Sequence, residues 1–270
     1  MKREQEGGRL FILTTTNGKY QIEVQKLLGS YVNEDGEAIE HQIYFFHPER
    51  RSEFIKKKMA FKKHCCLVIL YPEQRYGELK DVNTYHPPCF EIMEQTIPNT
   101  REGRRVVKTA IEYCRKYKES LGIDWLELGD NAIYYCYQIR RPKYSIKLSL
   151  SRQLLGQYPY YWRFGFRPIL PVVEERIMYN IDKMATLPIN YEISRGRDIL
   201  RYLLEEIKLT GLLVDEIGAK YKICDSLVVF LRWLSSNYCE IYCGIYERLF
   251  FLLELQDPYS GVDSGWELVL

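Results

Sequence analysis

The order of apolar and polar residues in the N-terminal third of the chain predicts a set of β-strands. The runs RLFILTT, KYQIEVQKLL and HQIYFF are rich in β-branched and aromatic residues, which favour a pleated, half-buried strand. Asn17-Gly18 and Glu34-Asp35-Gly36 are turn signals, and the first of them predicts a hairpin. Compact apolar runs at residues 64–71 and 89–97 predict two further strands.

A helix followed directly by a strand is the clearest pattern in the chain. Asn99 is suited to cap the helix, with Glu102 three residues later as its reciprocal partner. Apolar side chains recur at helical spacing and predict one buried face: Val106, Val107, Ala110, Ile111 and Cys114. Gly122 ends the helix, and IDWLELGD at residues 123–130 predicts the next strand. Because strand, helix and strand in this order form a βαβ unit, we expect the strands at 89–97 and 123–130 to be parallel.

The second half of the chain changes from strands to helices. IYYCYQIRRPKYSIKLSL predicts a hairpin, and two short helices follow, one ended by Gly156 and one starting at Pro159. After Pro171 the chain has helical periodicity with few strand signals, and the last ten residues predict a loosely ordered tail. We therefore predict an α/β or α+β fold with a mixed-sheet domain at residues 1–170 and a helical subdomain at residues 171–270.

Composition excludes several classes of protein. The chain is 46% hydrophobic and 27% charged, which is typical of a globular protein and not of a disordered one. No apolar run is long enough to span a bilayer, and the N-terminus lacks a signal-peptide pattern, so we expect an intracellular, cytoplasmic protein. Eight cysteines without a C-x-x-C pair predict reduced core side chains.

The turn IPNTREGRR, between the predicted strand and helix, is a candidate anion site. Exposed amide groups in the first turn of a helix and the helix dipole both favour a phosphate. Arg101, Arg104 and Arg105 add positive charge beside them. The alternative is an ordinary capped helix with a solvated basic face.

Together these elements resemble the GNAT superfamily of acyl-CoA-dependent N-acyltransferases. The order is strand, anion-binding turn, helix, parallel strand, and then Tyr161-Trp162-Arg163-Phe164-Gly165-Phe166, which is similar to the family's Tyr-x-x-x-Gly-Phe signature. The resemblance implies a splayed sheet with acetyl-CoA between its two parallel strands. It also implies that Tyr161 protonates the departing thiolate. A carboxylate on the first strand, Glu91 or Glu94, would assist deprotonation of the amine acceptor.

The turn departs from the family's pattern of small residues. Gly103 is its one glycine, and Arg104 and Arg105 follow where small residues are expected. The resemblance therefore implies that the pyrophosphate of acetyl-CoA binds near Arg101, Gly103, Arg104 and Arg105, through arginine side chains as well as amides. The alternative is that these arginines block the cleft.

A narrower resemblance covers residues 123–166. LELGDNA and IKLSLSRQLLGQYPYYWRFGF are similar to GNAT-like proteins of large nucleocytoplasmic DNA viruses. This similarity implies a viral protein, located in the host cytoplasm or the virion. It leaves open a second function: a non-enzymatic scaffold that binds a protein partner through its C-terminal helices.

Other chemistry is less well supported by the sequence. His86 and Cys89, and the run His64-Cys65-Cys66, contain metal-ligand types, but adjacent strand residues point to opposite faces, so we predict no metal site. The Cys89–His86 pair has no third group to orient it as a nucleophile. Basic patches are interleaved with acidic residues and the net charge is +2, so we do not predict nucleic acid binding.

Overall fold

The computed structural model describes most of the chain, in ten ranges: residues 10–14, 21–32, 38–46, 66–80, 101–129, 133–138, 141–193, 196–206, 211–262 and 265–270. The chain forms two compact units: residues 1–129 with 267–270, and residues 130–266. Helices and a mixed sheet are both present, so the predicted α/β or α+β class is confirmed. These two units are defined by which residues pack together. The domain boundary predicted near residue 170 stays a prediction.

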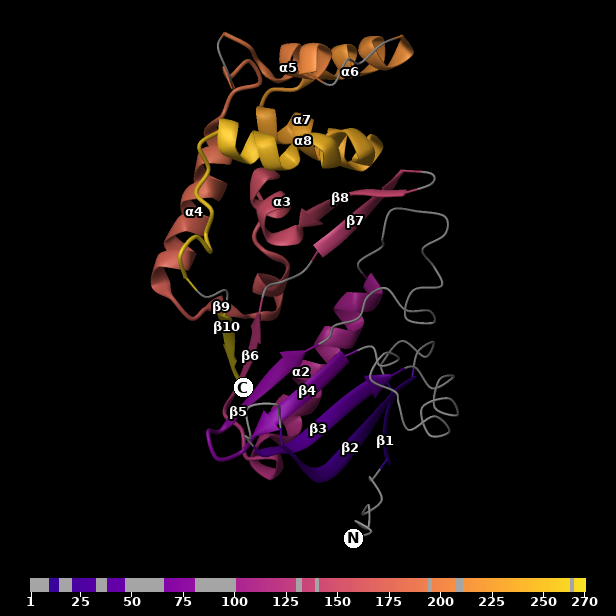
Figure 1. Ribbon diagram of the computed structural model, residues 1–270, viewed down its shortest axis with the longest axis vertical. Coiled ribbons are helices and arrows are strands. Elements are labelled where there is room, and N and C mark those ends of the chain that lie inside the picture. The colour runs from indigo at the N-terminus through magenta and orange to yellow at the C-terminus, as the bar shows by residue number, and fades with distance from the viewer. Residues whose placement is uncertain are drawn as a thin grey trace. The chain divides into compact units, whose positions relative to one another are not determined.

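The first unit contains a meander of antiparallel strands (Figure 1). Each strand pairs with the one before it along the chain: β1 (Leu10–Thr14), β2 (Gln21–Val32), β3 (Ala38–Phe46), β4 (Cys66–Tyr71) and β5 (Tyr76–Lys80). β4 is almost wholly buried, as its unbroken apolar run predicts. The sequence pattern did not predict β5, which is short and contains Gly77 and Glu78.

A tight turn connects β4 to β5. The amide of Gln74 donates to the carbonyl of Tyr71, and the amide of Arg75 donates to that of Pro72, at 3.1 and 3.2 Å. Arg75 has a positive φ of 61° and forms a bidentate ion pair with Asp124. This ion pair ties the turn to the segment that precedes the next strand.

A long helix connects β5 to a parallel strand. The helix α2 (Arg101–Leu121) buries Val107, Ala110, Ile111 and Cys114, which confirms its predicted apolar face. The strand β6 (Trp125–Gly129) follows it and pairs parallel with β5. Asn99 and the predicted strand at residues 89–97 lie outside the described residues.

The strand β10 (Gly265–Val269) corrects the prediction of a loosely ordered tail. From Glu267 onward it belongs to the first unit, where it is the neighbour of β6 and the amide of Leu270 donates to the carbonyl of Asp124 at 2.9 Å. Trp266 and Leu268 are buried in alternation with exposed residues. Alternation of buried and exposed side chains is a strand pattern. Over only five residues, among glycines and acidic residues, the sequence does not reveal it.

The second unit begins with the predicted hairpin and continues with helices (Figure 1). The hairpin is β7 (Ile133–Gln138) with β8 (Arg141–Lys147). The elements that follow are α3 (Leu148–Leu154), the 3₁₀ helix η3 (Tyr160–Phe164), β9 (Arg167–Pro168), α4 (Pro171–Thr186), α5 (Ile199–Glu206), α6 (Leu212–Ile223), α7 (Leu227–Asn237) and α8 (Cys239–Leu252).

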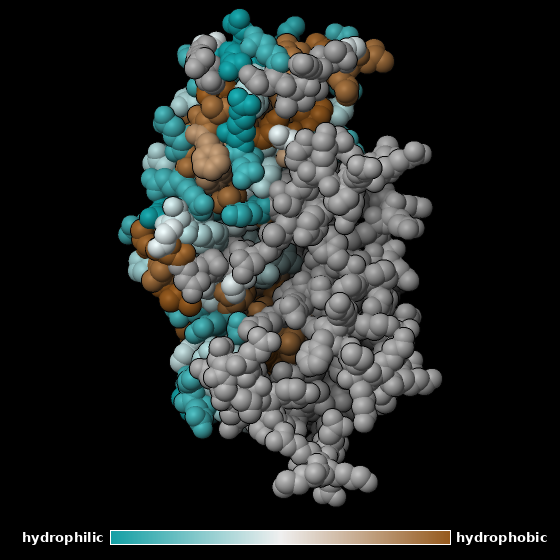
Figure 2. Space-filling model, in the orientation of Figure 1, coloured by the Kyte–Doolittle hydropathy of each residue, from teal (hydrophilic) through white to brown (hydrophobic). Residues whose placement is uncertain are grey.

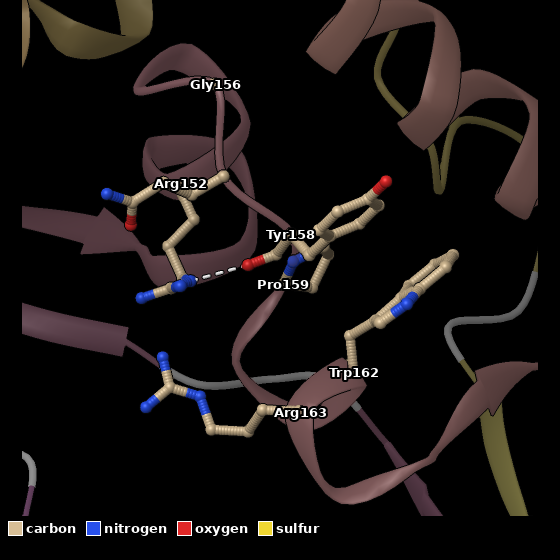
Figure 3. Close-up of a pocket in the computed structure, with 7 residues that line it drawn as sticks. Arg152, Gly156, Tyr158, Pro159, Trp162 and Arg163 are labelled. Carbon is tan, nitrogen blue, oxygen red and sulfur yellow. Dashed lines mark hydrogen bonds between the residues drawn. The ribbon is translucent and has the colours of Figure 1, made fainter.

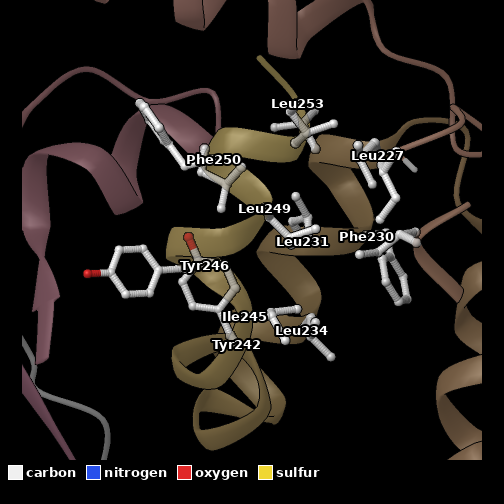
Figure 4. Packing of buried hydrophobic residues seen from close by; sticks show 14 of the residues in the cluster. Leu227, Phe230, Leu231, Leu234, Tyr242, Ile245, Tyr246, Leu249, Phe250 and Leu253 are labelled. Atoms are coloured by element: carbon white, nitrogen blue, oxygen red, sulfur yellow. The ribbon is translucent and has the colours of Figure 1, made fainter. Parts of the chain in front are cut away.

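The core of this unit lies around α7 and α8 (Figure 4). Leu231 and Leu234 of α7 pack with Ile245 and Leu249 of α8, and all four are buried. A buried polar pair accompanies them: the Asn180 amide donates to the Gln153 side-chain oxygen and to the backbone carbonyl of Gln256, both at 2.7 Å. Because both amide side chains have partners, the core accommodates them without a large desolvation penalty.

The cysteines follow their prediction only in part. Cys66, Cys114 and Cys224 are buried, and burial raises the pKa of the Cys114 thiol to about 12. Cys239 and Cys243 lie one helical turn apart with their Sγ atoms at 3.7 Å. Cys243 is disulfide-bonded, so the prediction of reduced cysteines is wrong at this position. The Cys239 thiol is therefore the donor in this contact, because a disulfide sulfur carries no proton.

Candidate functional site

In the first unit, the parallel pairing of β5 with β6 ends before either strand ends. The ladder joins Tyr76 to Trp125, Gly77 to Leu126 and Glu78 to Glu127, although β5 continues to Lys80 and β6 to Gly129. The carboxyl ends of the two strands therefore extend beyond their last paired residues. In sheets of α/β type, ligands bind at the carboxyl ends of parallel strands.

Two carboxylates face each other at the last pair of this ladder. Paired residues of parallel strands project to the same face, so Glu78 and Glu127 lie side by side. Glu78 accepts a hydrogen bond from the Tyr71 hydroxyl at 3.4 Å, and Glu127 accepts one from the Trp125 indole at 2.8 Å. Both carboxylates are half-buried, and they are oriented by neighbours on the same sheet face.

Aromatic rings cover the same face of the sheet next to the carboxylates. Tyr76 stacks between Tyr71 and Trp125, with ring centroids at 4.7 and 5.9 Å. On the opposite face Leu79, Leu126 and Leu128 are buried. The sheet thus has an apolar face toward the core and a face with rings and carboxylates that remains partly accessible.

The first turn of α2 lies toward this end of the strands. Because α2 leads into β6 through Gly122, its N-terminal end is directed toward the carboxyl end of β6 (Figure 1). Arg101, Gly103, Arg104 and Arg105 belong to the first turns of α2, and their side chains lie outside the described part of the structure. The amide groups in the first turn of a helix point outward at the helix start, where they can bind an anion.

Of the other predicted site residues, two lie outside the described residues and one belongs to the second unit. Glu91 and Glu94 lie outside the described residues. Tyr161 belongs to the second unit, in η3, where its side chain is 8% exposed. Its ring meets those of Tyr160 and Phe166 edge to face, at 5.3 and 6.2 Å.

A glycine ends η3. Gly165 has φ of 94°, a left-handed conformation that favours glycine, and the chain then enters β9. Beside η3 lies a hollow of about 350 Å³, lined in part by Arg152, Tyr158 and Arg163. The sequence pattern did not single out this hollow.

Sequence reasoning missed Glu78 and Glu127 for different reasons. Glu127 lies between Leu126 and Leu128 in a predicted strand, so its alternation with buried residues was a usable signal. Glu78 lies in a short strand with a glycine and two charged residues, which has no strand pattern of its own.

Comparisons with protein-family models, curated proteins and solved structures find no match. Among the described residues, no group of three or more His, Cys, Asp or Glu side chains is placed to hold a metal ion. Within the same residues, every helix is too short or too polar to cross a bilayer.

Proposed function

We propose that this chain is an acyl-CoA-dependent N-acyltransferase whose site lies where β5 and β6 part. The observation that carries the proposal is the end of their parallel ladder at Glu78 and Glu127, with α2 connecting the two strands. A splayed parallel pair joined by a helix is how the GNAT-like arrangement holds acyl-CoA, so a GNAT-like fold is part of the proposal.

The start of α2 is the proposed site for the pyrophosphate of acetyl-CoA. Its first amides and the helix dipole favour an anion, and Arg101, Arg104 and Arg105 supply positive charge from the same turns. Guanidinium groups bind phosphate oxygens through two parallel hydrogen bonds, so they can replace the close backbone approach that small residues permit.

Glu78 is the proposed general base, because it is the carboxylate on the first of the two parallel strands. Acetyl-CoA supplies the acyl group as a thioester. Glu78 accepts the proton that leaves the amine as its nitrogen bonds to the acyl carbon. Protonation of the sulfur as the carbon–sulfur bond breaks is the role that the resemblance implies for Tyr161, and this role is a separate prediction from that of Glu78. The products are an amide and a thiol.

Ligand-dependent stabilisation tests whether acetyl-CoA binds at all. A ligand that binds only the folded state stabilises it by RT ln(1 + [L]/Kd), about 2.7 kcal/mol at a hundredfold excess over Kd. We expect millimolar acetyl-CoA to raise the melting temperature. No shift at this concentration would overturn the proposal.

Kinetics of matched variants test the assigned roles, with release of CoA in the presence of a panel of primary amines as the readout. We expect Glu78→Gln and Tyr161→Phe to lower kcat by about 10²- to 10⁴-fold, with little change in acetyl-CoA affinity. Glu175→Gln alters an exposed carboxylate on α4 and should leave the rate unchanged. Full activity in Glu78→Gln would remove this residue from the mechanism.

A non-enzymatic scaffold that binds a protein partner, in a virion or elsewhere, is the second candidate function. The described surface of α6 favours it, because Leu212 and Ile223 are 86% and 71% exposed. Figure 2 shows apolar surface over α5 and α6 among hydrophilic side chains. Exposed apolar side chains that lie together mark interaction sites. Co-purification with a virion fraction, without acetyl-CoA binding, is the result expected for this candidate.

A further inference from the structure

The hollow between the end of α3 and η3 brings two arginines together (Figure 3). Arg152 comes from α3 and Arg163 from η3, and both guanidinium groups lie on the same side of the segment that contains Pro159. The rings of Tyr158 and Trp162 lie on its other side. All four residues are among those that line a space of about 350 Å³, which is within the size range of small-molecule sites.

Arg152 is held in place with much of its hydrogen-bonding capacity unused. Its Nε donates to the carbonyl of Tyr158 at 2.6 Å, which orients the planar guanidinium. Among the described residues, no carboxylate lies within ion-pair distance of Arg152 or Arg163. The two terminal nitrogens of Arg152 therefore remain available as donors.

The two positive charges act on each other. Burial and the nearby charge of Arg163 lower the pKa of Arg152 to about 10. Arg152 therefore stays protonated at neutral pH, and both charges are present in one half-enclosed space. Like charges at close range destabilise each other, and an anion between them would convert this repulsion into attraction.

The walls of the hollow are supported by further contacts. Tyr158 stacks on Trp162 with ring centroids at 4.8 Å, and the Arg163 guanidinium lies 5.0 Å from the Tyr160 ring centre. Arg232 donates to the carbonyls of Leu155 and Gly156, at 2.8 and 3.0 Å, and so fixes the turn after α3. A site whose donors are held before the ligand arrives loses less conformational entropy on binding.

We propose that this hollow binds the phosphate group of a small phosphate monoester between Arg152 and Arg163. A phosphate dianion matches two guanidinium charges, and each guanidinium can bind two of its oxygens. Neither Arg152 nor Arg163 has a role in the proposed acyltransferase reaction, so the two proposals are tested separately.

Binding of inorganic phosphate, measured by calorimetry at constant ionic strength, tests this site. We expect saturable binding by the intact chain and at least a tenfold rise in Kd for both Arg152→Gln and Arg163→Gln. Arg115→Gln removes the same charge from an exposed position on α2 and should leave the Kd unchanged. Since Arg163 is exposed, its variant should fold even if Arg152→Gln does not.

Two outcomes would overturn the proposal: no saturable phosphate binding at millimolar concentration, or equal affinity in Arg163→Gln and the unaltered chain. Phenyl phosphate is the second ligand of the test, because it carries the same phosphate group on a phenyl ring. It should displace inorganic phosphate, and failure to compete would contradict a shared phosphate site. Glu78→Gln should bind phosphate normally, so failure of the acyltransferase proposal can be distinguished from failure of this one.

Discussion

Trp266 combines complete burial with an unmet hydrogen bond. Its side chain is fully enclosed, and its indole Nε1 has no hydrogen-bond partner among the described residues. It lies edge to face with Trp162, with ring centroids at 6.1 Å. An unpaired buried donor costs about 1–3 kcal/mol, whereas truncating a buried tryptophan costs about 3–5 kcal/mol, so packing outweighs the unmet bond.

Two substitutions at Trp266 separate these effects. We expect Trp266→Ala to lower the free energy of unfolding by about 3–5 kcal/mol, because it leaves a large cavity. Trp266→Phe keeps much of the apolar volume and removes the unpaired N–H, so its loss should be clearly smaller. Urea unfolding monitored by circular dichroism gives both values. Equal losses would show that ring packing is not the dominant contribution.

Tyr242 makes the free energy of unfolding depend on pH in the alkaline range. Burial raises the pKa of its phenol above the usual value, and its hydroxyl lies 3.0 Å from both the hydroxyl and the carbonyl of Ser151. Above about pH 10 the unfolded chain loses this proton and the folded chain keeps it. The free energy of unfolding therefore falls as pH rises, by up to about 1.4 kcal/mol per pH unit for this group.

Tyr242→Phe should make the alkaline loss of stability less steep, since one of the contributing groups is gone. Urea titrations between pH 8 and about pH 11 measure the slope. Tyr179→Phe, which alters an exposed ring on α4, is the matched control and should leave the slope unchanged. An unchanged slope in Tyr242→Phe would contradict the assignment.

At the scale of elements, the turn after α3 depends on one glycine. Gly156 has φ of 60°, and a Cβ there would lie 2.9 Å from Val228 of α7. A left-handed conformation costs a residue with a Cβ about 1–2 kcal/mol, and the overlap adds to that cost. The turn after α3 can therefore lie against Val228 because this position has no side chain.

Gly156→Ala should consequently destabilise the chain more than Gly261→Ala. Gly261 has φ of 74° with no atom within 4 Å of a Cβ position, so its variant carries only the conformational cost. We expect a difference of about 1–3 kcal/mol between the two in denaturant unfolding. Equal values would show that the contact with Val228 relaxes freely.

Elements with a long periodic pattern could be predicted from the sequence, and short ones could not. The apolar face of α2, the hairpin of β7 and β8, and the turns at Gly156 and Gly165 follow from spacing and glycine positions. β5 and β10 have five residues each, and their places in the sheet depend on neighbours far along the chain. The pairing of Glu78 with Glu127 depends on register, which local sequence does not specify.

At the scale of the whole molecule, each compact unit has its own buried side chains. β4 and α2 provide those of the first unit, and α7 and α8 those of the second. Separate cores are the condition under which equilibrium unfolding departs from a single two-state transition. The tryptophans report mainly on the second unit, because Trp125 belongs to the first and Trp162, Trp233 and Trp266 to the second.

We therefore expect urea transitions followed by tryptophan fluorescence and by far-ultraviolet circular dichroism not to coincide. The Trp125→Phe variant should leave fluorescence reporting on the second unit alone and increase the separation between the two curves. Coincident transitions in both proteins would indicate that the two units unfold as one.

The place of β10 beside β6 has a consequence for synthesis on the ribosome. Gly129 ends β6, and Gly265 begins β10, so the whole helical unit is translated between two neighbouring strands. At about 5–20 residues per second, this interval is on the order of ten seconds or more. During that time the nascent chain carries an uncovered strand edge at β6, which is open to incorrect pairing with other chains. The vulnerable period of this protein is thus set by the order of translation rather than by the stability of the finished fold.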